Sequence, residues 1–147
     1  MLISSTSVKK LAEYVENRDE VFCSGLFLSA RWMVISQLDR LGIQMIVLPD
    51  RDSAEYCAAD LYHLIEGDRV YFLPDSGKNL ERSNYKSSLG VQRTSAIGKI
   101  LEYKEGEQMI IVTYPSALEE IIPEKGKISG SLLKLAAGDE KPYEEIK

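Results

Sequence analysis

The stretch Ile43-Gln44-Met45-Ile46-Val47-Leu48-Pro49-Asp50 decides the fold class of this chain. Near-continuous apolar runs of this kind are typical of strands in parallel sheets that are covered on both faces. Asp50 or Asp52 can cap a helix over Ser53–Glu66, in which apolar residues recur at helical spacing, and Gly67 closes that helix. The sequence here predicts a strand followed by a helix, the repeating unit of an α/β protein.

Strands and helices alternate on both sides of this unit. Further strands are expected at Val21–Ser24, Arg69–Leu73, Glu107–Thr113 and Ser131–Leu135, and helices at Ser7–Asn17, Ala30–Leu41, Ser88–Tyr103 and from Pro115 to Pro123, with a long polar loop over Pro74–Lys86. Such alternation with short connections implies a parallel sheet with helices on both faces. We therefore expect a three-layer α/β domain.

The composition is that of a soluble globular protein of one domain. The chain has 147 residues, of which 44% are hydrophobic and 28% are charged. A formal net charge of -5 argues against a protein whose whole surface grips nucleic acid, and leaves a local basic patch open. Two cysteines are too few for a disulfide framework, and no segment approaches the ~18 apolar residues of a membrane span. We expect a cytoplasmic protein without a membrane partner.

A phosphate-binding loop is expected where the first predicted strand meets its helix, but the residues there depart from that motif. The order from Gly25 onward is that of G-x-x-x-x-G-K-[ST], with Ala30 at the second glycine, Arg31 at the lysine and Trp32 at the Ser/Thr. The side chain of Ala30 impedes close approach of a phosphate. Arg31 is a larger, planar donor, and Trp32 offers no oxygen to magnesium.

We interpret Gly25–Trp32 as a degenerate phosphate loop in which no residue is expected to bind a cofactor. The alternative is an accidental likeness, because a glycine before a helix is common in α/β proteins. No catalytic residue and no metal ligand are expected either. His63 is the only histidine, and a lone histidine without Cys, Asp or Glu at ligand spacing is more often a surface or packing residue than a ligand. No histidine is supplied locally to activate Cys23 or Cys57.

Ligands of parallel α/β sheets bind beyond the carboxyl ends of the strands, where Gly25, Asp50, Pro74 and Thr113 are all predicted to lie. Six basic residues could gather around this edge and the long loop: Arg51, Arg69, Lys78, Arg82, Lys86 and Arg93. Such a cluster would favour an anion, a phosphate backbone or an acidic protein face. Ordinary solvated charge is the alternative.

Several stretches in a fixed order carry a family resemblance: Gly25–Trp32, Ile46–Tyr56, Val70–Ser76, Arg93 and Ile110–Leu118. Together they resemble the first domain of the UvrB-like module at the N-terminus of bacterial transcription-repair coupling factors, the Mfd family. The likeness runs from about residue 8 to residue 137.

This resemblance implies a helicase-like, P-loop/RecA-like domain over residues 1–137, and in residues 138–147 the start of the next domain or a C-terminal tail. Mfd-like proteins are ATP-dependent DNA translocases that displace stalled RNA polymerase and recruit UvrA in transcription-coupled nucleotide excision repair. Their UvrB-like module has lost ATP hydrolysis. The resemblance thus implies a non-catalytic scaffold and interaction domain, with ATP and Mg confined to motor domains elsewhere in the parent protein.

The partners implied are UvrA, contacted mainly through the downstream domain, and RNA polymerase and DNA, contacted through other domains. Contacts between domains of the same protein are implied as well. Two other functions stay open. An active P-loop nucleotide hydrolase is opposed by Ala30, Arg31 and Trp32. A small-molecule-binding α/β domain of flavodoxin-like architecture is the second.

Overall fold

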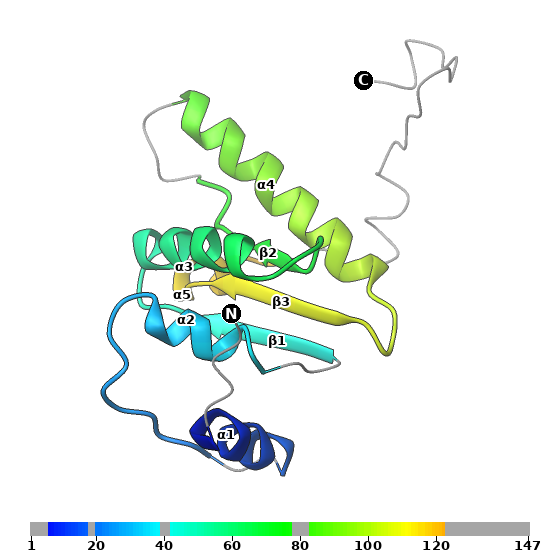
Figure 1. The fold of residues 1–147 in the computed structure, drawn as a ribbon. Helices are drawn as coiled ribbons and strands as arrows, with labels where there is room; N and C mark the ends of the chain where they lie inside the picture. The colour runs from blue at the N-terminus through cyan, green and yellow to red at the C-terminus, as the bar shows by residue number, and fades with distance from the viewer. Residues whose placement is uncertain (1–5, 18–19, 39–41, 78–82, 123–147) are drawn as a thin grey trace.

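The computed structural model describes residues 6–17, 20–38, 42–77 and 83–122, for the last of which the side chains are described from residue 88 onward (Figure 1). The helices are α1 (Thr6–Glu16), α2 (Ala30–Ile35), α3 (Arg51–Leu64), α4 (Ser83–Glu102) and α5 (Pro115–Glu119), and the strands are β1 (Gly42–Val47), β2 (Val70–Phe72) and β3 (Gln108–Thr113). The protein is therefore mixed α/β, as the sequence predicts.

The sheet of the described residues is small, open and entirely parallel, in the order β1-β3-β2. From β1 the chain passes through α3 to β2, which lies two positions away in the sheet. It then returns through α4 to β3, which lies between β1 and β2. As the central strand, β3 is the most deeply buried, with Ile110 and Val112 fully inaccessible. The predicted parallel sheet is confirmed.

Helices cover both faces of this sheet. On one face Trp32 of α2 and Cys57 and Leu61 of α3 pack with Ile110 and Val112 of β3. On the other face α4 packs through Ala96, Ile97 and Ile100 against Met109 and Ile111. Right-handed crossovers that run in opposite directions along a sheet place their helices on opposite faces, which accounts for the positions of α3 and α4.

The expectation of a strand at Val21–Ser24 is wrong for the described structure. Residues 20–24 form no ladder, and Phe22 is 94% exposed. β-Propensity is realised only when a neighbouring strand supplies hydrogen bonds and packing, and no described strand lies beside this segment. The context expected for a phosphate loop, a strand leading into a helix, is therefore not present in this structure.

Several helix boundaries also differ from expectation, most of all in α2 and α4. α2 ends at Ile35 rather than Leu41, because Ser36 and Gln37 bond their side chains to the carbonyl of Met33 and the next backbone bonds span three residues. α4 begins at Ser83, so the loop after β2 is shorter than Pro74–Lys86. The predicted strand at Ser131–Leu135 and the domain boundary after residue 137 lie outside the described residues.

Candidate functional site

The three strands end at one edge of the sheet, and each is followed there by polar residues. Asp50 follows β1, Asp75 follows β2, and Tyr114 follows β3. Asp50 caps α3 as predicted, since its Oδ1 accepts a 2.8 Å hydrogen bond from the backbone N–H of Ser53. These polar residues therefore lie at the edge where ligands bind in parallel α/β sheets.

Arg51, in the first turn of α3, follows β1 and hydrogen-bonds to residues that follow β2 and β3. Its Nη2 donates to both carboxylate oxygens of Asp75 at 2.8 Å, and its Nε donates to the hydroxyl of Tyr114 at 3.0 Å. The backbone N–H of Asp75 donates to the same hydroxyl, also at 3.0 Å. Tyr114 is buried, so its hydroxyl joins two loops inside the protein.

The carboxylate of Asp75 receives two more donors, the backbone N–H of Gly77 at 2.9 Å and the hydroxyl of Ser116 at 3.2 Å. Burial raises the pKa of Asp75, but the hydrogen bonds from Arg51 and Gly77 outweigh it and leave the pKa lowered. Burial likewise lowers the pKa of Arg51, and its bonds to Tyr114 and Asp75 more than reverse this. Both groups are therefore held in their charged forms.

A second pair lies beside the first. Arg93 of α4 is only 6% exposed, and its Nη1 donates to the carbonyls of Pro74 at 2.7 Å and Ala117 at 3.1 Å. Its Nε lies 3.2 Å from a carboxylate oxygen of Glu120. Glu120 in turn accepts from the backbone N–H and the hydroxyl of Ser76. We call these five residues, Arg51, Asp75, Arg93, Tyr114 and Glu120, the carboxyl-edge network.

Of the six basic residues predicted to gather here, the described structure brings Arg51 and Arg93 to the carboxyl edge. Each of these is paired with a carboxylate. Arg69 lies at the opposite edge, where its Nη1 donates to Gln108. Lys78 and Arg82, and the side chain of Lys86, lie outside the described part of the chain. The two arginines therefore hold loops of the protein together and do not present an unpaired cationic surface.

The segment predicted to be a degenerate phosphate loop is built around Trp32. This indole is 6% exposed and belongs to the main core, while the guanidinium of Arg31 lies 4.7 Å from the ring centroid. Ala30 begins α2, and Gly25 has a φ of +77° in open surroundings. In the described segment Trp32 thus serves as a packing residue.

A hollow of about 350 Å³ lies beside this segment, lined by Leu28, Ser29, Arg31, Trp32, Ser53, Tyr56 and Asp60. Two hydrogen bonds with charged groups cross its lining: the hydroxyl of Ser29 donates to Asp60 at 2.6 Å, and the guanidinium of Arg31 donates to the carbonyl of Leu28 at 3.4 Å. Leu28 has a φ of +48°, a left-handed conformation that costs about 1–2 kcal/mol for a residue with a bulky side chain. The hollow has aromatic, cationic and anionic walls, and none of these features selects one ligand.

The two cysteines have different surroundings in the structure. Burial raises the pKa of Cys57 to about 12, so this thiol stays protonated at neutral pH. Cys23 is exposed. Within the described ranges, no three His, Cys, Asp or Glu side chains are grouped as a metal site would require.

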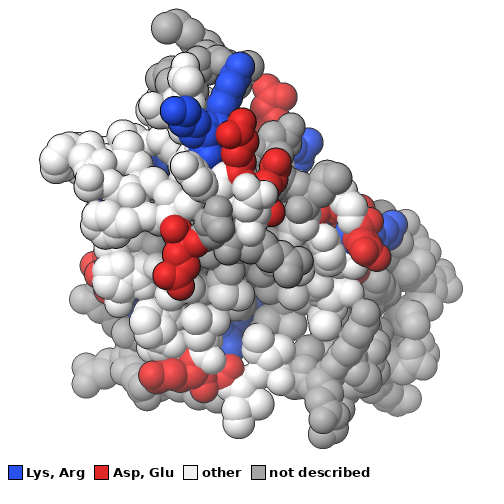
Figure 2. Space-filling view, turned by 90° about the horizontal axis from the view of Figure 1, so that it is seen from below, with Lys and Arg blue, Asp and Glu red and all other residues white. Residues whose placement is uncertain are grey.

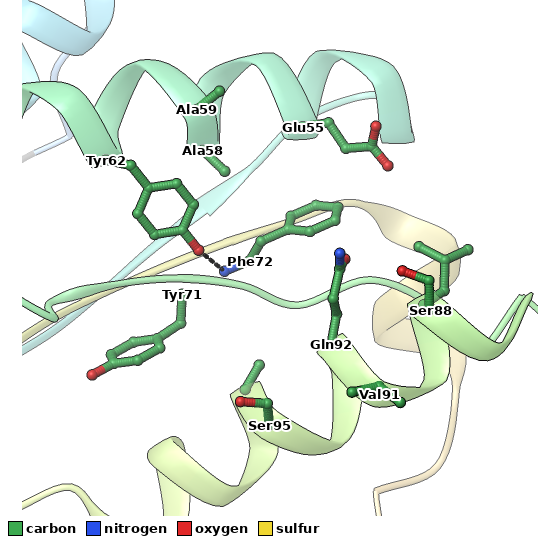
Figure 3. A pocket seen from close by; sticks show the side chains of 12 residues that line it. Glu55, Ala58, Ala59, Tyr62, Tyr71, Phe72, Ser88, Val91, Gln92 and Ser95 are labelled. Carbon is green, nitrogen blue, oxygen red and sulfur yellow. Dashed lines mark hydrogen bonds between the residues drawn. The ribbon is translucent and has the colours of Figure 1, made fainter. Parts of the chain in front are cut away.

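A larger pocket, which sequence reasoning missed, lies between α3 and α4 beside the open edge of β2 (Figure 3). Its volume is about 570 Å³, and it is lined by Glu55, Ala58, Ala59, Tyr62, Tyr71, Phe72, Ser88, Leu89, Val91, Gln92, Ser95 and Ala96. Tyr62 points toward β2, where its hydroxyl accepts the backbone N–H of Phe72 at 3.3 Å. The signal in the sequence was the pair Tyr71-Phe72, because neighbours on an edge strand point to opposite faces and can line both walls.

Comparison of the chain with models of protein families, with curated proteins and with solved structures gave no match. Among the described helices, none is both long enough and apolar enough to cross a membrane.

Proposed function

We propose that this chain is a non-catalytic scaffold and interaction domain of the UvrB-like module of a transcription-repair coupling factor. In this proposal it has a degenerate helicase-like, RecA-like fold and acts in the cytoplasm. The parent protein is an ATP-dependent DNA translocase that displaces stalled RNA polymerase. The module recruits UvrA mainly through the domain that follows this one, and ATP and magnesium act only in the motor domains.

The observation that carries the proposal is the carboxyl-edge network. An enzyme of parallel α/β architecture needs polar groups at this edge that are free to contact a substrate. Here the guanidinium of Arg51 is committed to Asp75 and Tyr114, and that of Arg93 to Glu120 and three backbone carbonyls. Groups already paired inside the protein favour a structural role for this edge.

The degenerate loop supports the same conclusion from another part of the chain. Magnesium-dependent phosphoryl transfer needs a hydroxyl on the metal and backbone N–H groups around the phosphates. Trp32 stands at the position of that hydroxyl and is buried in the core. Hydrolysis of ATP by this domain is therefore disfavoured, and its function is expected to reside in surfaces that contact other proteins or domains.

The proposal is tested by UvrA binding, measured by surface plasmon resonance for two polypeptides. One is the chain of 147 residues, and the other continues past Lys147 into the downstream domain. We expect weak or absent binding by the first and clear binding by the second. Strong binding by the 147 residues alone would contradict the placing of the contact surface, and absent binding by both would contradict the proposed function.

A small-molecule-binding domain is the second candidate, and the pocket between α3 and α4 favours it. A pocket of about 570 Å³ with aromatic walls and a few polar groups has the size and character of many ligand sites. Native mass spectrometry of the purified protein distinguishes the two candidates. A stoichiometric small molecule that is lost on substitution of Tyr62 by Ala would favour this second function.

A further inference from the structure

The pocket between α3 and α4 contains three aromatic rings, which other contacts in the protein hold in place. The hydroxyl of Tyr62 accepts the backbone N–H of Phe72 at 3.3 Å, and the hydroxyl of Tyr71 donates to the carbonyl of Asp68 at 2.6 Å. The ring of Phe72 stacks on that of Tyr114, with 6.2 Å between the ring centroids. The aromatic walls are therefore formed before any ligand arrives, which lowers the entropic cost of binding a flat molecule.

Small side chains on both helices leave room for a ligand beside these rings. Ala58 and Ala59 of α3 and Ser95 and Ala96 of α4 line the pocket. Because α3 and α4 pack on opposite faces of the sheet, the edge of β2 lies between them (Figure 3). The pocket volume of about 570 Å³ is within the range of about 300–1,000 Å³ that is typical of small-molecule sites.

Polar side chains lie toward one end of the pocket and aromatic ones toward the other. Figure 3 shows Glu55 of α3 and Ser88 and Gln92 of α4 at the first end. Tyr62 and Tyr71 lie toward the second end. Within the part of the chain that the structure describes, the side chains of Ser88 and Gln92 make no hydrogen bond. Unlike the paired groups of the carboxyl-edge network, they are available to donate to a ligand and to accept from it.

The charge of the pocket disfavours a phosphorylated ligand. Among the described lining residues, Glu55 alone is charged at neutral pH. The described basic side chains of α4 are engaged elsewhere, since Arg93 bonds to Glu120 and Lys99 to Asp68. Figure 2, which views the face that lies lowest in Figure 1, likewise shows basic side chains beside acidic ones and no broad basic patch among the described residues. A phosphate in the pocket would meet a carboxylate of like charge.

We propose that the pocket between α3 and α4 binds an uncharged nucleoside, with its base against Tyr62 and Phe72 and its sugar hydroxyls toward Glu55 and Gln92. Every base has a flat π-face that stacks on aromatic side chains, and carboxylates accept hydrogen bonds from ribose hydroxyls. The phosphates of a nucleotide are repelled by Glu55, so ATP is not a ligand of this pocket. This inference deepens the small-molecule function given above as the second candidate, and it rests on that function and not on the scaffold role.

Titration of the full chain with adenosine and with uridine tests the proposal, followed by the backbone amide signals in NMR correlation spectra. We expect saturable shifts at Tyr62, Phe72 and Gln92, and about tenfold weaker binding of AMP than of adenosine. The absence of saturable shifts with both nucleosides overturns the proposal. Binding of AMP as tightly as adenosine overturns it too, as do shifts at the hollow beside Trp32 in place of the pocket.

Substitutions of Tyr62 test the stacking. Tyr62→Ala removes an aromatic wall and should weaken adenosine binding about tenfold, whereas Tyr62→Phe keeps the ring and should bind as the unmodified chain does. The matched control is Tyr56→Ala, which removes an exposed tyrosine of the same helix that does not line this pocket and should leave the affinity unchanged. Unchanged affinity in Tyr62→Ala, or lost affinity in Tyr62→Phe, overturns the proposal.

Glu55→Gln supplies a test that is independent of the aromatic wall, should Tyr62→Ala fail to fold. This variant removes the charge that repels phosphate, so the preference for adenosine over AMP should shrink. An unchanged preference would show that Glu55 does not face the ligand and would overturn the proposal.

Failure of this inference is distinguishable from failure of the functions proposed above. A bound small molecule that native mass spectrometry finds, and that is not a nucleoside, would overturn the inference and leave the second candidate function standing. The scaffold role is decided by the UvrA comparison, which none of these titrations affects.

Discussion

Arg51 and Asp75 are joined by two 2.8 Å hydrogen bonds from a single guanidinium nitrogen, although 24 positions separate them in the sequence. The pair links the first turn of α3 to the loop after β2. Both side chains are mostly covered, at 21% and 15% exposed, so solvent and salt screen their attraction less than they would on the surface. The pair therefore holds the start of α3 and the loop after β2 together at the carboxyl edge of the sheet.

Acid should destabilise the protein through Asp75. A carboxyl whose pKa is lowered in the folded state contributes stability that is fully present above its unfolded pKa, near 3.8, and that is lost as pH falls through its folded pKa. Urea unfolding should therefore show falling stability below about pH 4. Asp75→Asn should cost about 1–2 kcal/mol at neutral pH and should flatten this acid decline.

The matched control is Glu105→Gln, which changes an exposed carboxyl in the turn before β3. This variant should keep the acid decline of the unmodified protein. An Asp75→Asn variant with an unaltered pH profile would show that other carboxyls govern acid unfolding.

Arg93 should be among the most sensitive positions in the chain. Arg93→Met leaves the carbonyls of Pro74 and Ala117 and the carboxylate of Glu120 without their donor in a buried setting. Loss of one partner from such a pair costs about 3–5 kcal/mol, which chemical denaturation measures directly. Lys99→Met on the same helix breaks the exposed pair with Asp68 and should leave the denaturation midpoint unchanged. Equal effects of the two variants would contradict the structural role of Arg93.

Substitution of Trp32 should lower the free energy of unfolding more than substitution of Arg31. Trp32→Ala opens a cavity against α3 and should cost about 3–5 kcal/mol in urea unfolding. Arg31→Ala removes a cation–π contact and should cost about 0.5–1 kcal/mol. The reverse order would indicate that Arg31, and not the indole, organises the segment.

The two cysteines should react with a thiol reagent at very different rates. Cys23 is exposed and should react at once with an aromatic disulfide reagent at pH 8. Cys57 is fully buried, and burial raises its pKa to about 12, so it should react only as the protein unfolds. Single variants Cys23→Ser and Cys57→Ser assign the fast and slow phases, and rapid reaction of Cys57 in the folded protein would contradict its place in the core.

The sequence was sufficient to predict the elements that carry their own local signals. The apolar run of β3, the cap at Asp50 and the helical spacing of α3 are all visible in the chain and are confirmed. The strand expected at Val21–Ser24 is wrong because strands need neighbours, and sequence periodicity does not report whether a neighbour is present. α4 begins at Ser83, five residues before the predicted start at Ser88. The polar residues from Ser83 onward are compatible with both a loop and a helix, so the sequence pattern does not locate the start of this helix.

The candidate site was only partly predictable. The position of the carboxyl edge followed from the alternation of strands and helices, and Arg51 and Arg93 were among the residues expected near it. Their carboxylate partners were not foreseen, because Asp75 and Glu120 are brought to them by loops whose paths no local pattern specifies. The pocket beside β2 depends on two helices that pack on opposite faces, which is a tertiary property.

Calorimetric titration of the full chain with Mg-ATP tests the central claim, that the carboxyl edge and the segment Gly25–Trp32 have no nucleotide-binding function. The account predicts no heat of binding, both for the unmodified chain and for Arg31→Ala. Binding at low micromolar concentration that is abolished by Arg31→Ala would contradict it, because Arg31 would then serve as the phosphate-binding cation of a working loop.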